Sequence, residues 1–150
     1  SKGLGAPAGS VLVGSAERVA EARVWRKRLG GGMRQAGVLA AAMLYALDHH
    51  IDRLADDHAA AKDIATVVSA AAPDVVDPAD VDTNIVVLDL AGTALTSGAL
   101  VTMLKGEGIL AGSVGSRYVR LVTHLDVTAA ECRRAAEATA GLLSLAAPPG

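Results

Sequence analysis

The sequence begins with SKGLGAPAGSVLVG, in which Lys2 is followed by closely spaced glycines. A lysine amine becomes a useful nucleophile when burial beside apolar groups or another cation lowers its pKa. Gly3, Gly5 and Gly9 would let the backbone approach a ligand closely. Lys2 is therefore a candidate nucleophile, and the alternative is a solvated lysine without a chemical role.

A second candidate site is the stretch WRKRLGGGMRQ, where cations surround three glycines ahead of a predicted helix. The four cations are Arg26, Lys27, Arg28 and Arg34. Glycines, cationic donors and a helix N-terminus together suit a phosphate or a carboxylate. The alternative is an ordinary loop between two helices with its charges in water.

The third candidate is SRYVRLVTHLDV, a predicted strand with two arginines. Arg117 and Arg120 are three residues apart, so they should face opposite sides of a sheet. A guanidinium that holds a carboxylate by two contacts can orient an amino acid. We favour Arg120, because Val119 and Leu121 flank it and an unpaired charge among apolar residues would be costly. The alternative is a salt bridge on an edge strand.

The remaining reactive side chains give weaker signals. His49 and His50 end a predicted helix, and His58 follows eight or nine residues later without a convergent third ligand. We therefore predict no metal site. His124 is interpreted as a structural, hydrogen-bonding histidine, and Cys132 as a small buried hydrophobic side chain.

Composition limits the class of protein. The 150 residues are 51% hydrophobic and 20% charged, which is typical of a globular chain with its own core. A formal charge of −2 gives no electrostatic basis for nucleic acid as a partner. The single cysteine cannot form an internal disulfide, and the sequence has no apolar run or leader pattern that predicts a membrane span or secretion. We expect a cytoplasmic protein with no membrane partner.

The candidate residues must be positioned by helices and strands, whose expected ranges follow from the sequence. The expected helices cover residues 16–29 with Ser15 as cap, 33–50, 51–72, a short helix in 96–108 that Gly106 closes, and 128–146 with a capping box between Thr128 and Glu131. The expected strands cover residues 10–14, 83–90, 108–113 and 117–125.

The order of these elements predicts a small α/β layer packed with helices. The apolar helix at 33–50 should be buried on most sides, inside the protein or against another subunit. The strand at 10–14 has no sequence neighbour to pair with, and an isolated strand is not stable. Its partners are expected in another chain or in further sequence.

Together these stretches resemble the low-specificity L-threonine aldolases, which are fold-type-I pyridoxal-phosphate enzymes. The resemblance covers nearly the whole chain. It rests on SKGLGAPAGSVLVG, WRKRLGGGMRQAGVLAAAMLYAL, RLADDHAAAKDIA, DTNIVV and VRLVTHLDV in that order. It implies an α/β fold in which residues 1–47 end the large cofactor-binding domain and residues 48–150 form a small carboxy-terminal α/β domain. It also implies a carboxy-terminal portion that starts at the cofactor lysine, with the amino-terminal half of the enzyme missing.

The resemblance assigns a role to each candidate residue. Lys2 would bond covalently to pyridoxal 5'-phosphate, and Lys27 and Arg34 would approach the cofactor phosphate or the active site across a subunit interface. Arg120 would bind the α-carboxylate of an amino-acid substrate. The implied enzyme is a lyase, a homo-oligomer that is tetrameric in the family, and it cleaves L-threonine or L-allo-threonine to glycine and acetaldehyde. The alternatives are a related β-eliminating amino-acid lyase, or an inactive carboxy-terminal fragment with a structural or oligomerisation role only.

Overall fold

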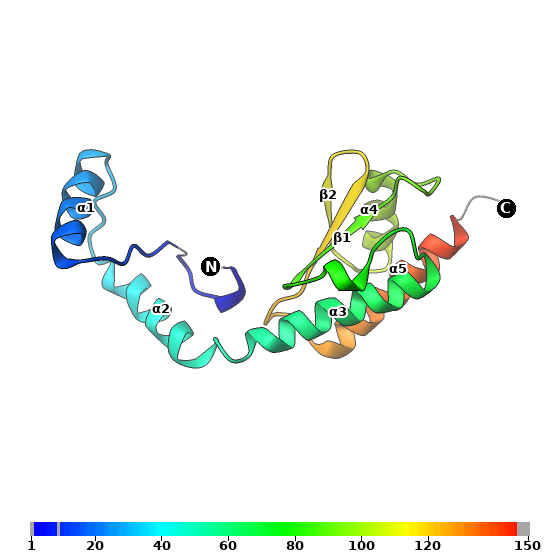
Figure 1. Ribbon diagram of the computed structural model, residues 1–150, viewed down its shortest axis with the longest axis horizontal. Helices are drawn as coiled ribbons and strands as arrows, with labels where there is room; N and C mark the ends of the chain where they lie inside the picture. The colour runs from blue at the N-terminus through cyan, green and yellow to red at the C-terminus, as the bar shows by residue number, and fades with distance from the viewer. Residues whose placement is uncertain (1, 9, 147–150) are drawn as a thin grey trace. The chain divides into compact units, whose positions relative to one another are not determined.

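The computed structural model describes residues 2–8 and 10–146, and Figure 1 labels its helices and strands. The chain divides into two compact units, Ser1–Asp52 and Arg53–Gly150. The boundary predicted from the sequence lies between residues 47 and 48, five residues before this division. The assignment of the two parts to a large and a small domain stays a prediction.

The unit Ser1–Asp52 contains helices but no strand among its described residues. Its elements are the 3-10 turn η1 (Lys2–Leu4) and the helices α1 (Ala16–Arg28) and α2 (Gly37–His49). The predicted cap of α1 is confirmed, because the Ser15 hydroxyl oxygen accepts a hydrogen bond from the Arg18 amide. Glu17 lies in the first turn of α1 and three cations lie in its last turn, so both signs suit the helix dipole.

Two predictions for this unit are wrong. Residues 10–14 form no strand, because a strand needs a neighbour and no described residue of this unit supplies one. The helix predicted from residue 33 begins at Gly37 instead, since Gln35 has a left-handed backbone with φ 54°. Within this chain α2 buries only Ala46. Burial of α2 inside the whole protein or against another subunit stays a prediction.

The unit Arg53–Gly150 combines helices with a sheet. Its elements are α3 (Leu54–Ala71), η2 (Pro78–Asp80), β1 (Ile85–Asp89), α4 (Ser97–Gly106), β2 (Gly112–Val114), β3 (Tyr118–Val122) and α5 (Ala129–Leu145). The predicted capping box is confirmed, with Thr128 and Glu131 bonded to each other's backbone. The strand predicted at 108–113 is displaced to Gly112–Val114. The cause is a helix exit in which Gly108 takes φ 75° and the Ile109 amide bonds back to the Leu104 carbonyl.

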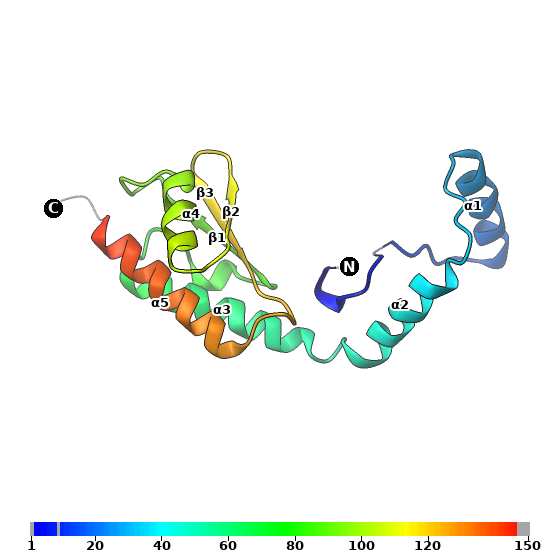
Figure 2. The same ribbon diagram turned by 180° about the vertical axis from the view of Figure 1, so that it is seen from behind.

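The sheet is antiparallel, with the strand order β1-β3-β2. Val86 pairs with Leu121 and Leu88 pairs with Val119, and these four side chains are buried on one face. Helices α3, α4 and α5 lie on the covered side of the sheet (Figures 1 and 2). The opposite face carries the alternate residues of β1 and β3 and is open. Side chains of β3 therefore contribute both to the core and to an exposed surface.

Small side chains build the helical half of the core. Ala61 and Ala65 of α3 and Ala136 of α5 are at most 1% exposed, which lets the two helices pack closely. Larger side chains such as Leu88 and Leu100 fill the space beneath the sheet. Alanine-rich helix faces packed against aliphatic side chains therefore form the core of this unit. None of the described helices combines the length and the apolar character that crossing a bilayer requires.

Candidate functional site

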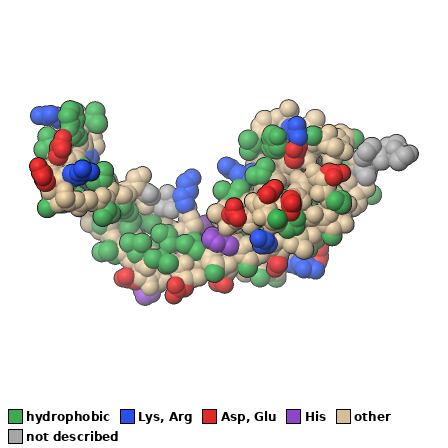
Figure 3. Space-filling view, in the orientation of Figure 1, with side chains coloured by type: hydrophobic (Ala, Val, Ile, Leu, Met, Phe, Trp, Pro, Cys, Tyr) green, Lys and Arg blue, Asp and Glu red, His purple; other side chains and the backbone are tan. Residues whose placement is uncertain are grey.

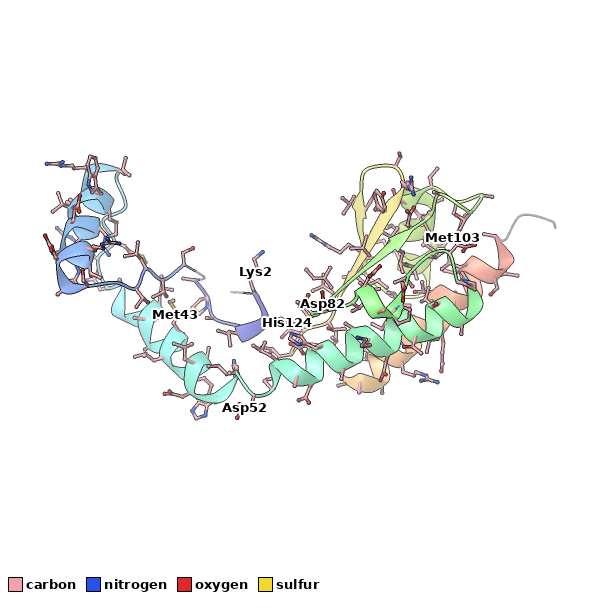
Figure 4. All side chains as sticks on the ribbon, viewed as in Figure 1. Lys2, Met43, Asp52, Asp82, Met103 and His124 are labelled. Carbon is pink, nitrogen blue, oxygen red and sulfur yellow. The ribbon has the colours of Figure 1, made fainter. Side chains whose placement is uncertain are left out.

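Lys2 lies in a loop with an unusual backbone. Its φ is 69°, in the left-handed region that side-chain-bearing residues rarely adopt, at a cost of roughly 1–2 kcal/mol. Gly5 is also left-handed, at φ 66°, and its amide donates to the Lys2 carbonyl oxygen at 2.8 Å. The Lys2 side chain extends away from the loop (Figure 4), while Gly9 lies outside the described residues. The loop therefore fixes the direction in which the lysine amine leaves the backbone.

The lysine loop is tied to the end of α2. His50 Nδ1 lies 2.6 Å from the Leu4 carbonyl oxygen. The His50 ring also meets the Tyr45 ring edge-on, with centroids 5.6 Å apart. Sequence analysis interpreted His50 only as a helix-terminal residue. Its contact with Leu4 spans 46 residues, so no local pattern points to it.

The amine of Lys27 lies close to the backbone of the glycine turn that follows α1. Gly30 has φ 80°, and the Gly31 amide donates to the Arg26 carbonyl oxygen at 2.8 Å. A Cβ atom at Gly31 would lie 2.8 Å from Arg26 Cγ, so a larger residue would force that side chain to shift. A Cβ atom at Gly32 would lie 3.1 Å from Lys27 Nζ. The absence of side chains on this turn thus leaves the space in which Lys27 lies.

Lys27 and Arg34 are exposed cations on either side of this turn. Neither makes an ion pair with a carboxylate among residues 2–8 and 10–146. Arg34 lies two residues before Ala36, the N-cap residue of α2, which supplies no side-chain hydrogen bond to the first helical amides. Uncapped amides beside unpaired cations favour an anion. The structure therefore supports the anion-binding interpretation of this stretch, and it shows no contact between Lys27 and Arg34.

Arg120 lies on the open face of the sheet, at the centre of its middle strand. It pairs with Val87 of β1 and with Gly112 of β2. Its Nε and Nη2 atoms are each 3.9 Å from the place of a Cβ atom at Gly112, so the guanidinium lies over that glycine. Val119 and Leu121 point into the core on the other face. The apolar flanks that led us to Arg120 therefore do not surround its charge, and that part of the argument is wrong.

Arg117 is occupied by a different contact. Its Nε and Nη2 atoms both donate to the Asp89 carboxylate, and this pairing lowers the pKa of Asp89, with a smaller contribution from the Ala91 amide. Arg120 has no such ion pair within the described part of the chain. Because β3 is the central strand, an edge-strand salt bridge does not describe Arg120. Of the two arginines, Arg120 is the one left to bind an external carboxylate.

The surface around Arg120 is apolar. Its exposed members on the three strands are Ile85, Val87, Val114, Tyr118 and Val122. The attraction between this guanidinium and a carboxylate would become stronger if the ligand excluded water from the surface. The open face of the sheet therefore suits a small molecule that carries a carboxylate.

The other reactive side chains have structural surroundings. His124 Nδ1 is 3.1 Å from the Asp126 carboxylate, which supports a structural role for this histidine. Cys132 is buried in the core as predicted, and burial raises the pKa of its thiol. Within residues 2–8 and 10–146, no three histidine, cysteine or acidic side chains gather as they would around a metal ion.

A buried hydrogen-bond network at the end of β3 was missed by sequence analysis. The Thr123 hydroxyl donates to the backbone carbonyl of Asp57 at 2.6 Å, and Asn84 Nδ2 donates to the Thr123 carbonyl at 2.7 Å. Asp57 is itself buried, and its carboxylate accepts two hydrogen bonds from Arg53. The spacing of Arg53 and Asp57 at i and i+4 is the one local signal of this network. It secures the strand that carries Arg120 to the start of α3.

Comparison with known families decides what kind of chain this is. Residues 1–91 match the family model described as beta-eliminating lyase. The chain belongs to the beta-eliminating lyase family. Members of this family are fold-type-I pyridoxal-phosphate enzymes, and the α/β class expected from the sequence is confirmed. Of the predicted site residues of this beta-eliminating lyase, Lys2, Lys27 and Arg34 lie inside the matched stretch and Arg120 lies beyond it.

Individual relatives cover more of the chain than the family match does. The low specificity L-threonine aldolase of Escherichia coli strain K12 is 43% identical over 128 residues, which are 85% of this chain and 36% of the relative. Low-specificity L-threonine aldolase 1 of Arabidopsis thaliana is 42% identical over 132 residues, covering 87% and 37%. The Candida albicans enzyme of the same name is 38% identical over 103 residues, covering 69% and 27%. This beta-eliminating lyase chain therefore spans between 27% and 37% of the length of these relatives.

Proposed function

We propose that the whole protein is a pyridoxal-phosphate-dependent aldolase that cleaves L-threonine or L-allo-threonine to glycine and acetaldehyde. The observation that carries the proposal is Lys2, whose amine leaves a left-handed, glycine-flanked loop inside the stretch that matches the beta-eliminating lyases. Relatives named low-specificity L-threonine aldolase support the choice of reaction, with 42–43% identity over most of this chain.

The donor set of the chain fits pyridoxal phosphate and an amino acid. The cofactor offers an aldehyde and a phosphate, and the substrate offers a carboxylate. Lys2 supplies an amine for the aldehyde, and the glycine turn with Lys27 and Arg34 supplies cations and backbone amides for the phosphate. Arg120 supplies a guanidinium without a carboxylate partner among the described residues. Each group on the ligands thus has a complementary group in the chain.

In this proposal the chain binds and orients, and the cofactor performs the electronic step. When bound, pyridoxal phosphate accepts the electron pair released at the substrate Cα as the bond from Cα to Cβ breaks. Lys2 holds the cofactor through its Nζ atom, and Lys27 and Arg34 neutralise the phosphate charge. Arg120 holds the substrate carboxylate by two hydrogen bonds and so restricts how the Cα bonds are presented.

A related activity is favoured by the family match itself. The description beta-eliminating lyase points to loss of a group from Cβ, which would yield a 2-oxo acid and ammonia instead of glycine and an aldehyde. Both reactions use the same amine, phosphate and carboxylate contacts. The residues considered above therefore do not distinguish the two reactions, whereas analysis of the products does.

The test uses the whole natural protein that contains this sequence. It is incubated with pyridoxal phosphate, reduced with borohydride and mapped by peptide mass, and unreduced protein is then supplied with L-threonine and L-allo-threonine. We expect a phosphopyridoxyl adduct on Lys2 and equal amounts of glycine and acetaldehyde. A 2-oxo acid with ammonia would establish β-elimination instead. An adduct on another lysine, or none, would overturn the role of Lys2.

We also propose that the protein acts as a cytoplasmic homo-oligomer, a tetramer as the resemblance implies. Support comes from large hydrophobic side chains exposed in the unit Ser1–Asp52, several of them on α2, as Figure 3 shows. Those on α2 are Val38, Leu44, Tyr45 and Leu47. Apolar surface of this extent is typical of a protein interface.

A further inference from the structure

His50 donates a hydrogen bond to the lysine loop. Its Nδ1 atom is 2.6 Å from the Leu4 carbonyl oxygen, and a carbonyl oxygen can only accept. The proton of the contact is therefore on Nδ1. Both residues are partly buried, so water competes less for this contact than it would at an exposed site.

His50 is itself held in place by α2. It is the C-cap residue of this helix, and its backbone amide donates to the carbonyl of the buried Ala46 at 2.9 Å. Its ring stands at 85° to the ring of Tyr45, an edge-on contact that restricts the orientation of the imidazole. The donor nitrogen thus comes from a side chain fixed at both its backbone and its ring.

The Leu4 carbonyl belongs to the peptide group that also controls Lys2. The N–H of this same peptide is that of Gly5, and it donates to the Lys2 carbonyl oxygen at 2.8 Å. One rigid, planar unit is therefore held by His50 at its oxygen and holds Lys2 with its nitrogen. Hydrogen bonds arranged in this way through one peptide strengthen each other. Without the His50 contact, the peptide could rotate, release the Lys2 carbonyl oxygen and open the turn between Lys2 and Gly5.

We propose that His50 is a positioning residue for Lys2. Through the Leu4–Gly5 peptide it holds the Lys2 carbonyl oxygen, and so fixes the backbone from which the amine extends before any cofactor arrives. This inference rests on the proposed function, in which Lys2 supplies the amine that holds the cofactor. A residue at the end of α2 would thus influence the reaction through Lys2, without contacting the cofactor or the substrate.

The test compares two nearly isosteric replacements in the whole protein. His50→Asn keeps an N–H donor near the position of Nδ1, whereas His50→Asp presents only acceptor oxygens to the Leu4 carbonyl. His49→Asp is the matched control, because it places the same charge at the same helix end. His49 is exposed, and no hydrogen bond joins its side chain to the lysine loop within the described residues.

The first readout is hydrogen exchange at the Gly5 amide in cofactor-free protein. We expect exchange about tenfold faster in His50→Asp than in wild type, the effect of losing a hydrogen bond in a partly buried site. His50→Asn and His49→Asp should each stay within about threefold of wild type. Equal exchange in His50→Asp and His49→Asp would overturn the inference, as would failure of His50→Asn to preserve protection.

The second readout is the rate at which pyridoxal phosphate forms a borohydride-trapped adduct on Lys2. We expect a rate about tenfold lower in His50→Asp, with the other two variants near wild type. If wild type forms its adduct elsewhere, the proposed function fails, whatever the exchange data show. If wild type labels Lys2 and His50→Asp labels it equally fast, the proposed function stands and the positioning role fails.

Discussion

The Arg117 guanidinium binds the Asp89 carboxylate through both Nε and Nη2, and this pair joins the start of β3 to the end of β1. Each of the two side chains thereby has a partner of opposite charge. Arg120, three residues further along the strand, has no equivalent ion pair among the described residues. Arg117, just before β3, is therefore used for structure, and Arg120, within β3, is available for a ligand.

Replacing Arg120 tests this division of roles. We expect Arg120→Ala to raise the KM for the amino-acid substrate by roughly 10- to 100-fold, since a charge-assisted contact contributes about 1.5–3 kcal/mol. The cofactor adduct on Lys2 should still form. Steady-state kinetics and borohydride trapping measure the two effects. Loss of the adduct would show instead that Arg120 supports the fold or the cofactor.

Replacing Asp89 affects stability in a way that depends on pH. Arg117 lowers the pKa of Asp89, so its ionised form is favoured in the folded protein. The stabilisation is present above the ordinary aspartate pKa of about 3.9 and disappears as the pH falls through the lowered pKa of the folded state. Asp89→Asn should therefore be less stable than wild type at neutral pH, and the difference should shrink in acid.

Urea unfolding at neutral pH and at about pH 3 measures this difference. Because Arg117 is exposed and Asp89 is only half-buried, we expect a small effect at neutral pH that added salt weakens. A difference that grows on acidification would contradict the assignment.

The buried hydroxyl of Thr123 should contribute measurably to folding. Thr123→Val keeps the shape of the side chain but removes the donor to the Asp57 carbonyl, and we expect a loss of about 1–2 kcal/mol of unfolding free energy. Thr123→Ser retains the hydroxyl and serves as the control for the lost bond. Denaturant titration of all three proteins measures the effect. Equal loss in both variants would mean that the methyl group matters and the hydrogen bond does not.

The apolar surface of α2 should be covered in the assembled protein. We expect Ala41→Asp, which places a charge on this exposed helix, to dissociate the oligomer before it unfolds the protomer. Ala59→Asp places the same charge on an exposed position of α3 and should leave the assembly intact. Sedimentation velocity distinguishes the species. An unchanged oligomer in Ala41→Asp would remove α2 from the interface.

Local signals predicted the helices well. Ser15 caps α1, and Thr128 with Glu131 caps α5, because these contacts join residues only three apart. The strand predicted at 10–14 fails for the opposite reason, since strand formation depends on a distant partner that local residues cannot reveal.

In the candidate site, too, local sequence indicated single residues but did not reveal contacts between distant residues. Lys2, Lys27 and Arg120 could be selected from their sequence context, and their roles stay predictions. Val119 and Leu121 face the core, so they do not surround the Arg120 charge as predicted. His50 and Thr123 were missed, because their partners Leu4 and Asp57 are 46 and 66 residues away. Contacts at such separations are set by tertiary packing, which no spacing rule encodes.

Helix α1 buries none of its 13 residues. A helix of this length is marginal in water without tertiary packing, so its persistence depends on surfaces that come to cover it. Coverage by a second protomer would follow mass action, and the fraction of ordered α1 would rise with protein concentration. Lys27 is on that helix, so dilution alone would reduce the number of complete copies of the proposed phosphate site in solution.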